Sequence, residues 1–361
     1  MTRVVTGGAG FVGLHLVREQ LFQGRHVTVL SHVRGGRDRI EGFLAATGEL
    51  DQLPVPLKKS LTVLPVDLEQ PMLGMSRIDY RRLAATTAEI WHVAGAVDLH
   101  GKDAHVWRTN VHGTENLLRL ASLSPGGTPL RHISTAFVAG TRQGHVREDD
   151  GEPTEAFENA YEHAKHEAEA LVRDWADREG RRALIFRPGL LVPPGPRTVP
   201  DLPAHALSTL YEATRQLAGT DGRTELRVAA DPRAQLNLLP VDWAARAMEH
   251  LASNDEVTGV SVVHVVHSGN VPVRVIAAAL EDVCSVRIRM TPAMPAEPTI
   301  LERDFHRQIA GFLPYFRHRR HFDDTALRER VTALVPPPNI DRPYLRFCFG
   351  APVTAPRTTE A

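Results

Sequence analysis

The sequence predicts an α/β fold: a doubly wound parallel sheet (a Rossmann domain) with a smaller, discontinuous and mostly helical C-terminal substrate lobe. Two observations predict it. Short β-branched runs alternate with amphipathic stretches from the first residues onward, and a glycine-rich turn joins the first run to the first helix. Such alternation indicates a parallel sheet between two layers of helices. Right-handed crossovers then wind the chain to both sides of the first strand.

The predicted elements follow one another regularly through the first half of the chain. Strands are expected at 4–6, 26–30, 61–66, 89–93, 130–134 and 183–187. The amphipathic stretches expected to be helices are 11–22, 106–121 and 156–178. Proline and glycine then interrupt regular structure between 188 and 203. One further helix and strand are expected at 241–252 and 261–267.

The C-terminal part is expected to contain helices at 271–283, 301–313 and 325–334, separated by proline-rich loops. Residues 336–361 contain too many prolines for a helix, so we expect this end to fray. The sequence thus predicts a doubly wound domain of residues 1–190 plus 236–268, which the motifs below assign to NADP binding. Residues 191–235 plus 269–361 would form the substrate lobe.

Composition limits the class of protein. The 361 residues include 42 basic and 43 acidic side chains, for a net charge of −1. A nucleic-acid binder is therefore not expected, nor is broad attraction to an anionic membrane. No apolar run approaches the ~18 residues that span a bilayer, and no apolar leader follows the basic start. Cys284 and Cys348 are too few for a disulfide framework or a cysteine-rich metal site. We expect a cytoplasmic protein without a metal.

Dinucleotide binding is predicted from the turn after the first strand, which reads Thr6-Gly7-Gly8-Ala9-Gly10-Phe11-Val12-Gly13. Glycines permit a tight turn and let the backbone approach a pyrophosphate, which the N–H groups and dipole of the next helix then hold. The spacing of Gly7, Gly10 and Gly13 differs from the commoner G-x-G-x-x-G. The predicted contacts are Gly7, Gly10, Phe11, Val12 and Gly13.

The end of the second predicted strand indicates which dinucleotide is bound. An acidic residue there would bind the ribose 2′-hydroxyl of NAD, whereas arginine accommodates the 2′-phosphate of NADP. The sequence offers Arg34 and Arg37 and no acidic residue before Asp38. This favours NADP(H), with Arg34 as the predicted contact. The alternative is an ordinary solvated loop, since the chain has only four lysines among its basic residues.

Catalysis is predicted from Tyr161 and Lys165, which lie four residues apart and so share one face of a helix. Tyrosine has an ordinary pKa near ~10, so proton transfer at neutral pH needs a nearby cation. Lys165 is expected to supply that cation and to hydrogen-bond the nicotinamide ribose. Two adjacent hydroxyls, Ser134 and Thr135, end the fifth predicted strand, where ligands of doubly wound sheets lie. Either is a candidate to hold a substrate carbonyl oxygen, although strand-end hydroxyls also form turns and helix caps.

Further motifs extend this pattern along the chain. They are VDLEQPMLGMS at 66–76, IWHVAGAV at 90–97, NVHGTEN at 110–116, FRPG at 186–189 and NLLPVD at 237–242. Together with the glycine turn and the Tyr161/Lys165 pair, they resemble the extended short-chain dehydrogenase/reductase superfamily. Within it, the chain is most similar to the thioester reductase and fatty acyl-CoA reductase (male sterility-like) branch. The resemblance implies NADPH-dependent reduction of an acyl thioester to an aldehyde and, with a second hydride, an alcohol.

The resemblance also assigns residues. Thr135, five residues before Gly140, matches the catalytic Ser/Thr position, so the implied catalytic set is Thr135, Tyr161 and Lys165. The further implied cofactor contacts are Asp67 and Leu68 at the adenine ring, Ala94, Gly95 and Ala96 along the cofactor, Asn110 bracing the active-site helix, and Pro188 and Leu190 at the nicotinamide amide.

Several alternatives stay open. A thioester substrate would arrive on free coenzyme A or on a separate acyl carrier protein. A ketone or aldehyde oxidoreductase, a nucleotide-sugar epimerase or dehydratase, and a non-enzymatic cofactor sensor share the same scaffold. Residues 318–321 (HRRH) either meet a coenzyme A phosphate or an acidic carrier, or form a solvated cationic turn. Residues 193–203 either cover the substrate as a flap or form a plain loop.

Overall fold

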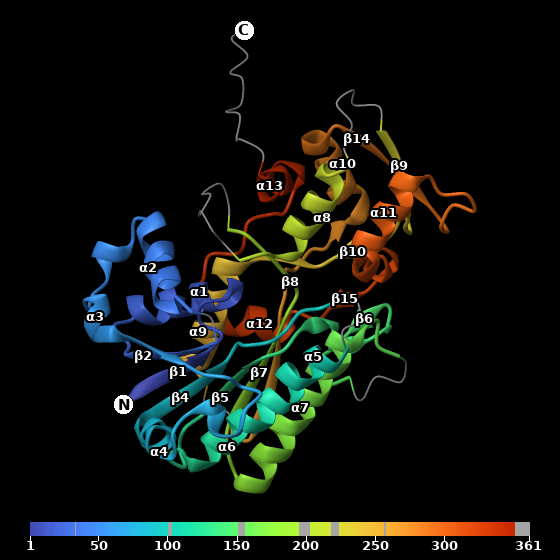
Figure 1. Cartoon of the computed structure of the whole chain (residues 1–361). Helices are drawn as coiled ribbons and strands as arrows, with labels where there is room; N and C mark the ends of the chain where they lie inside the picture. Colours follow the sequence, from blue (N-terminus) through green and yellow to red (C-terminus); the bar gives the residue numbers. More distant parts are fainter. Residues whose placement is uncertain are drawn as a thin grey trace.

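A seven-stranded parallel sheet with the order β12-β7-β5-β4-β1-β2-β3 forms the centre of the computed structural model (Figure 1). The structure describes residues 1–32, 34–99, 103–150, 156–194, 203–217, 224–255 and 258–350. The strands are β1 (Thr2–Thr6), β2 (Val27–Ser31), β3 (Leu61–Pro65), β4 (Thr87–His92), β5 (Leu130–Ile133), β7 (Ala183–Pro188) and β12 (Val260–Val265). The chain runs outward from β1 to both edges, which confirms the doubly wound fold.

Both faces of the sheet are buried. Successive residues of a strand point to opposite faces, so Val5 packs in one core and Val4 in another. One face is covered by α1 (Phe11–Phe22), α2 (Gly36–Ala46), α9 (Val241–Ser253) and α12 (Thr325–Arg330). The other is covered by α4 (Arg77–Thr86), α6 (Gly113–Leu123) and α7 (Ala160–Glu179). This double burial explains why the strands read as nearly continuous apolar runs.

A further apolar core lies in the C-terminal part of the chain, in the upper right of Figure 1. It is built from α8 (Ala206–Arg215), β9 (Thr224–Ala229), α10 (Val273–Cys284), β14 (Val286–Thr291), α11 (Ile300–Gln308) and α13 (Arg342–Cys348). It also includes Phe137, in the turn that follows β5. The division of the chain into two domains stays a prediction.

Short elements connect these parts. The small strand pairs are β6 (His145–Val146) with β15 (His321–Phe322), β8 (Leu190–Val192) with β11 (Leu238–Pro240), and β10 (Gln235–Leu236) with β13 (Val271–Pro272). The short helices are α3 (Leu57–Ser60), α5 (Asp103–Trp107) and the π-turn η3 (Arg108–His112). The 3₁₀ turns are η1 (Leu50–Gln52), η2 (Pro71–Gly74), η4 (Ala136–Ala139), η5 (Ala310–Phe312) and η6 (Pro314–Arg317).

The C-terminal part departs from the sequence expectation at two places. Strands β9 and β14, which pair in parallel, were not expected. The helix-free reading of residues 336–361 is wrong, because α13 spans Arg342–Cys348. Pro343 lies in its first turn, where a helix needs no N–H donor, and the Asp341 side chain caps it by accepting from Tyr344 N. Residues 351–361 lie outside the described residues.

Among the described residues, no helix is long and apolar enough to cross a membrane. The cytoplasmic location stays a prediction.

A buried ion-pair network ties the strands to α9 at the end of the sheet away from the glycine turn. The Arg131 guanidinium, 3 % exposed, donates to Glu89 at 2.8 Å and to Ala252 O at 3.1 Å, and it also pairs with Asp255. Arg3 bridges the same Glu89 (2.8 Å) to Glu249 (2.9 Å). The chain buries these carboxylates only because each has a cationic partner.

Removal of Arg131 leaves Glu89 with Arg3 as its remaining cation and removes the nearer cation from Asp255, whose other partner, Arg330, is 3.9 Å away. We expect Arg131→Ala to lower the free energy of unfolding by about 3–5 kcal/mol, measured by urea denaturation. The matched control is Arg82→Ala, which breaks an exposed pair with Asp79 at 3.8 Å and should cost less than about 1 kcal/mol. Equal losses in the two variants would contradict a role for burial in the Arg131 pairs.

Candidate active site

The glycine turn is packed so closely that side chains are excluded from it. A Cβ on Gly13 would lie 2.1 Å from Gly7 O, and one on Gly7 would lie 2.7 Å from Ala94 Cα. Gly7 has φ +68°, a conformation that glycine adopts without strain. Helix α1 begins directly after the turn, and no side chain caps its first N–H groups. A cradle of backbone with free N–H donors fits the pyrophosphate of a dinucleotide.

A chain of hydrogen bonds fixes this turn to the neighbouring strand and helix. Thr6 Oγ1 accepts from two N–H groups of the segment after β4, both at 3.1 Å, so its own hydrogen is directed to His92 Nδ1 at 2.8 Å. The hydrogen of His92 is then on Nε2, which donates to Thr114 Oγ1 at 2.9 Å. The Thr114 hydroxyl donates in turn to Asn110 O at 2.6 Å. Burial lowers the pKa of His92 to about 3, so its imidazole ring is neutral.

The side chain of Asn110 extends this series of hydrogen bonds to residues 94–96, which the sequence assigned to cofactor binding. Its side-chain oxygen accepts from Ala96 N at 2.8 Å, and its amide group donates to Ala96 O at 2.9 Å. This two-way bond holds residues 94–96 in one conformation. A Cβ on Gly95 would lie 3.1 Å from Lys165 Nζ and 3.2 Å from Asn110 Oδ1. The structure therefore brings Gly95, Asn110 and Lys165 together.

The three residues chosen as catalytic gather at the C-terminal end of β5. Thr135 follows the strand and caps η4, with its hydroxyl accepting from Phe137 N at 3.3 Å. Tyr161 and Lys165 lie on α7, which begins at Ala160 because the Asn159 side chain caps it by accepting from Glu162 N. The Thr135 side chain hydrogen-bonds Tyr161, and Lys165 Nζ donates to Ile133 O at 2.8 Å.

The protonation of these groups is set by burial and by neighbouring charges. Burial raises the pKa of Tyr161, and the nearby Glu162 raises it further, whereas the hydrogen bond from Thr135 lowers it. Burial lowers the pKa of Lys165 to about 8, although Glu169 acts in the opposite direction. The expected lowering of the tyrosine pKa by Lys165 is thus not what this structure shows. The Lys165 ammonium is directed to a main-chain carbonyl instead.

The arginines after β2 point in different directions. Arg34 is exposed in the turn. Arg37 is turned away from the glycine turn, since it donates to Glu41 at 3.0 Å and to Leu61 O at 2.6 Å. Arg39, which the sequence reasoning did not single out, reaches the glycine turn and donates to Ala9 O at 3.5 Å. Nothing in the sequence alone distinguishes Arg39 from Arg37.

Asp67 and Leu68 lie beside the same end of the sheet. Their segment starts where Val66 N donates to Ser31 O at 3.0 Å, next to the end of β2. Asp67 is exposed and accepts from Glu69 N at 2.9 Å, while Leu68 is half-buried and its carbonyl accepts from the Asn116 side chain at 2.8 Å. Both residues thus follow β3 next to the end of β2, with Leu68 against α6.

The segment around Pro188 and Leu190 runs from β7 into β8. A Cβ on Gly189 would lie 2.5 Å from Asn237 Oδ1, so only glycine fits there. The Gly189 and Leu190 N–H groups donate to Val265 O and Asn237 O, at 3.1 and 2.9 Å. Both N–H groups already donate within the fold, so neither can donate to a nicotinamide amide.

The cationic segment 318–321 is only partly at the surface. Arg320 is 2 % exposed, donates to Gly140 O at 2.7 Å and stacks over Phe137. His318 is buried and bonds Glu158 at 2.6 Å, whereas Arg319 is exposed and pairs with Asp231. Arg320 therefore cannot meet a coenzyme A phosphate or an acidic carrier, because its charge is buried inside the fold. For the exposed Arg319 such a contact stays a prediction. Most of the proposed flap, residues 195–202, lies outside the described residues.

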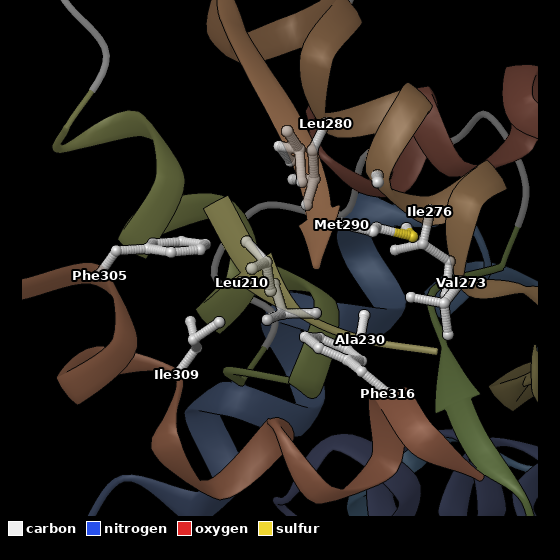
Figure 2. Close-up of a pocket in the computed structure, with 12 residues that line it drawn as sticks. Leu210, Ala230, Val273, Ile276, Leu280, Met290, Phe305, Ile309 and Phe316 are labelled. Carbon is white, nitrogen blue, oxygen red and sulfur yellow. The ribbon is translucent and has the colours of Figure 1, made fainter. Parts of the chain in front are cut away.

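A small apolar cavity of about 30 Å³ lies in the C-terminal core (Figure 2). Its walls come from α8, α10, α11, η6 and the β9/β14 pair, and the twelve side chains that line it are all apolar. Phe316, one of them, directly follows Tyr315, whose hydroxyl donates to Glu162 beside Tyr161 at 2.6 Å. The cavity and the tyrosine site are thus joined through η6. Among the described residues, no cluster of three or more His, Cys, Asp or Glu could hold a metal ion.

Comparison with known proteins identifies a family and several relatives that are similar to this chain. The family described as "Male sterility protein" matches residues 5–248. The chain is 30 % identical over 261 residues to a linear gramicidin synthase of Brevibacillus parabrevis, and 28 % identical over 285 residues to carboxylic acid reductase of Segniliparus rugosus. These matches cover 70 % and 69 % of this chain but 5 % and 23 % of the relatives, so the chain spans a small part of their length.

Solved structures share the fold. The terminal R domain from the myxalamid PKS-NRPS biosynthetic pathway superposes with a TM-score of 0.78 at 22 % identity, covering 97 % of this chain and 89 % of that one. A UDP-galactose 4-epimerase superposes with a TM-score of 0.66 at 20 % identity, covering 97 % of both chains.

The close packing of Gly13 yields a direct test of the glycine turn. The methyl group of Gly13→Ala would push α1 away from the turn, a strain of about 1–3 kcal/mol, so we expect nicotinamide dinucleotide binding to weaken ~10-fold or more. Quenching or enhancement of reduced-nicotinamide fluorescence measures the Kd. Gly42→Ala is the control, because nothing lies within 4 Å of its added methyl group. Unchanged binding by Gly13→Ala would contradict the assignment of this turn.

Proposed function

Because the chain belongs to the male sterility protein family, within the extended short-chain dehydrogenases/reductases, we propose that it is an NADPH-dependent acyl-thioester reductase. The enzyme would convert an acyl thioester into the aldehyde and, with a second hydride, into the alcohol. One observation carries the proposal: Thr135, Tyr161 and Lys165 meet at the carboxyl end of β5, beside the segment that Asn110 holds. That edge of a doubly wound sheet is where ligands bind.

One relative supports reduction of an acyl group over the other chemistries of this scaffold, since it is named a carboxylic acid reductase. The terminal R domain of the PKS-NRPS pathway and the UDP-galactose 4-epimerase support the fold alone. We infer that the acyl group arrives on coenzyme A or on an acyl carrier protein.

A bound nicotinamide cofactor supplies a hydride for the carbonyl carbon. Tyr161, protonated because burial raises its pKa, donates its proton to the carbonyl oxygen as negative charge develops there. Thr135 is a second donor to the same oxygen. The positive charge of Lys165 stabilises the negative charge left on Tyr161. The C–S bond of the resulting hemithioacetal then breaks. Its hydroxyl loses a proton, the departing thiolate gains one, and the aldehyde forms.

The C-terminal core is suited to enclose the substrate. We propose that residues 1–190 plus 236–268 bind the cofactor and that residues 191–235 plus 269–361 enclose the acyl group. The small cavity in Figure 2, about 30 Å³, is far smaller than a ligand pocket of ~300 Å³, so it does not itself hold the acyl group. Its apolar walls show that a buried polar group in this core would find no hydrogen-bond partner.

A substrate panel tests the proposal. The purified chain is incubated with NADPH and acyl-CoA esters, carrier-bound acyl thioesters, ketones or UDP-sugars, and NADPH oxidation and products are measured. We expect aldehyde from a thioester, and a ~10²–10⁴-fold lower kcat in Tyr161→Phe, which lacks the proton donor. Tyr211→Phe, at a half-buried tyrosine of α8, is the control. Turnover of ketones alone, or UDP-sugar conversion with retained NAD, would reject thioester reduction.

We propose that two arginines supply a preference for NADPH. Arg34 is exposed in the turn after β2, and Arg39 reaches the glycine turn, so both could meet a 2′-phosphate there. A charged hydrogen bond contributes about 1.5–3 kcal/mol, so Arg34→Ala and Arg39→Ala should each raise the KM for NADPH by ~10-fold with little effect on NADH. Arg37→Ala is the control, since Arg37 is held by Glu41 and Leu61 O. If only Arg37→Ala changed the KM for NADPH, this assignment would be contradicted.

A further inference from the structure

One tyrosine of the C-terminal core lies against both segments that carry the proposed proton donors. Tyr315 of η6 is 7 % exposed and lies 153 residues beyond Glu162 of α7. Its hydroxyl contacts the start of α7, the helix that carries Tyr161. Its ring contacts η4, the turn that begins directly after Thr135. The hydroxyl and the ring therefore connect Tyr315 to different parts of the site.

The hydroxyl of Tyr315 holds the first turn of α7. It donates to Glu162 Oε1 at 2.6 Å and accepts from Asn159 Nδ2 at 2.8 Å. Asn159 is the residue that caps α7, since its side-chain oxygen accepts from Glu162 N at 3.1 Å. Tyr161 lies between these two partners in the sequence. The Tyr315 hydroxyl thus fixes the turn of backbone from which the Tyr161 side chain extends.

The ring of Tyr315 holds the turn after β5. It meets the ring of Phe137 edge to face, with the ring centroids 5.2 Å apart and the planes at 90°. Aromatic pairs favour this arrangement. The Phe137 N–H donates to Thr135 Oγ1 at 3.3 Å, so Phe137 in turn holds the Thr135 hydroxyl. Tyr315 therefore contacts the immediate neighbours of both hydroxyls that are proposed to meet the substrate oxygen.

Tyr315 is itself anchored in the C-terminal core. Phe316 O accepts from Asp231 N at 2.9 Å, and His318 O accepts from Gln235 N at 3.0 Å. The Phe316 side chain lines the apolar cavity in Figure 2. The His318 ring packs against the edge of the Tyr315 ring, with centroids 5.3 Å apart. These contacts make η6 a fixed support for α7 and η4.

Two donors stabilise one developing oxyanion only when both lie within hydrogen-bond distance of it. A displacement of about 1 Å costs up to ~10²-fold in rate. We propose that Tyr315 is a positioning residue, whose hydroxyl and ring hold Tyr161 and Thr135 in the relative arrangement in which both donate to one carbonyl oxygen. The proposal rests on the proposed role of Tyr161 as the proton donor. Tyr315 acts through Tyr161 and Thr135 and not on the substrate itself.

A double-mutant cycle tests whether Tyr315 acts through Tyr161. Tyr315→Phe removes the hydroxyl and keeps the ring, and it is made both in the unaltered chain and in Tyr161→Phe. The kcat and KM are measured with NADPH and an acyl-CoA ester, the Kd for NADPH by reduced-nicotinamide fluorescence, and stability by urea denaturation. Tyr80→Phe is the matched control, because Tyr80 of α4 is a tyrosine 5 % exposed in the core under the sheet.

We expect Tyr315→Phe to lower kcat by ~10-fold, because the proton donor is displaced. The KM for the acyl-CoA ester and the Kd for NADPH should stay within about 2-fold, since binding is not what the hydroxyl supports. In Tyr161→Phe the same change should have no further effect on kcat, because the group that the hydroxyl positions is already absent. Tyr80→Phe should leave kcat unchanged in both chains.

Two further variants separate the contacts. Tyr315→Leu also removes the ring edge, so Thr135 is displaced as well, and kcat should fall further even in Tyr161→Phe. Asn159→Ser keeps an oxygen that caps α7 and removes the amide donor to Tyr315. It should lower kcat in the unaltered chain and not in Tyr161→Phe.

The outcomes are distinct. An unchanged kcat in Tyr315→Phe, or an equal fall in both chains, overturns the inference. Equal kcat values for Tyr315→Leu and Tyr315→Phe in Tyr161→Phe overturn the part that concerns Thr135. If Tyr315→Phe does not fold, Asn159→Ser decides by the same comparison.

Failure of the proposed function gives a different result. A chain that reduces a ketone and no thioester rejects thioester reduction, and the same cycle measured with the ketone then decides the role of Tyr315. A kcat that Tyr161→Phe does not change overturns both the proposed role of Tyr161 and this inference.

Discussion

The neutral ring of His92 is the contact on which the rest of the site depends. It accepts from Thr6 at the start of the glycine turn and donates to Thr114, which bonds the carbonyl of Asn110. The glycine turn, the segment 94–96 and the π-turn thus share one directed set of hydrogen bonds. A charged imidazole would place a donor against Thr6 and break that direction, and burial prevents it. Asn110 also hydrogen-bonds Ala96, and the neighbouring Gly95 lies beside Lys165.

Burial gives the ionisable groups of the site their properties. Lys165, Glu162 and Glu169 are all on α7 and all nearly fully buried. Each has a partner from another element: the β5 carbonyl of Ile133, Tyr315 of η6, and Arg187 of β7, which binds Glu169 at 2.8 and 2.9 Å. A buried charge without such a partner would lose its proton or gain one. The helix therefore depends on both the sheet and the C-terminal core for the partners of its buried side chains.

The sequence predicts what depends on local pattern. Alternating elements, the close-packed glycines and a tyrosine four residues before a lysine are read within one stretch of chain, and the doubly wound sheet follows from them. Contacts between distant stretches could not be predicted. Tyr315 against Glu162, Arg39 against the glycine turn and the burial of Arg320 depend on how the C-terminal lobe and α2 pack. The sequence did not predict the pairing of β9 with β14 or the start of α13 at Arg342, and the reasons differ. The first is a long-range pairing, and the second is a proline that the first turn of a helix tolerates.

The central claim is that this site transfers a hydride to the carbonyl carbon of an acyl thioester. The most direct measurement uses NADPH carrying deuterium at the transferred position, with mass spectrometry of the product and a thiol assay on the same sample. For each thiol released we expect one deuterium on the aldehyde carbon, or two on the carbon of the alcohol made from it, and none in Tyr161→Phe beyond its residual rate. Oxidised cofactor with neither labelled product, or label found only in alcohols made from ketones, would contradict thioester reduction at this site.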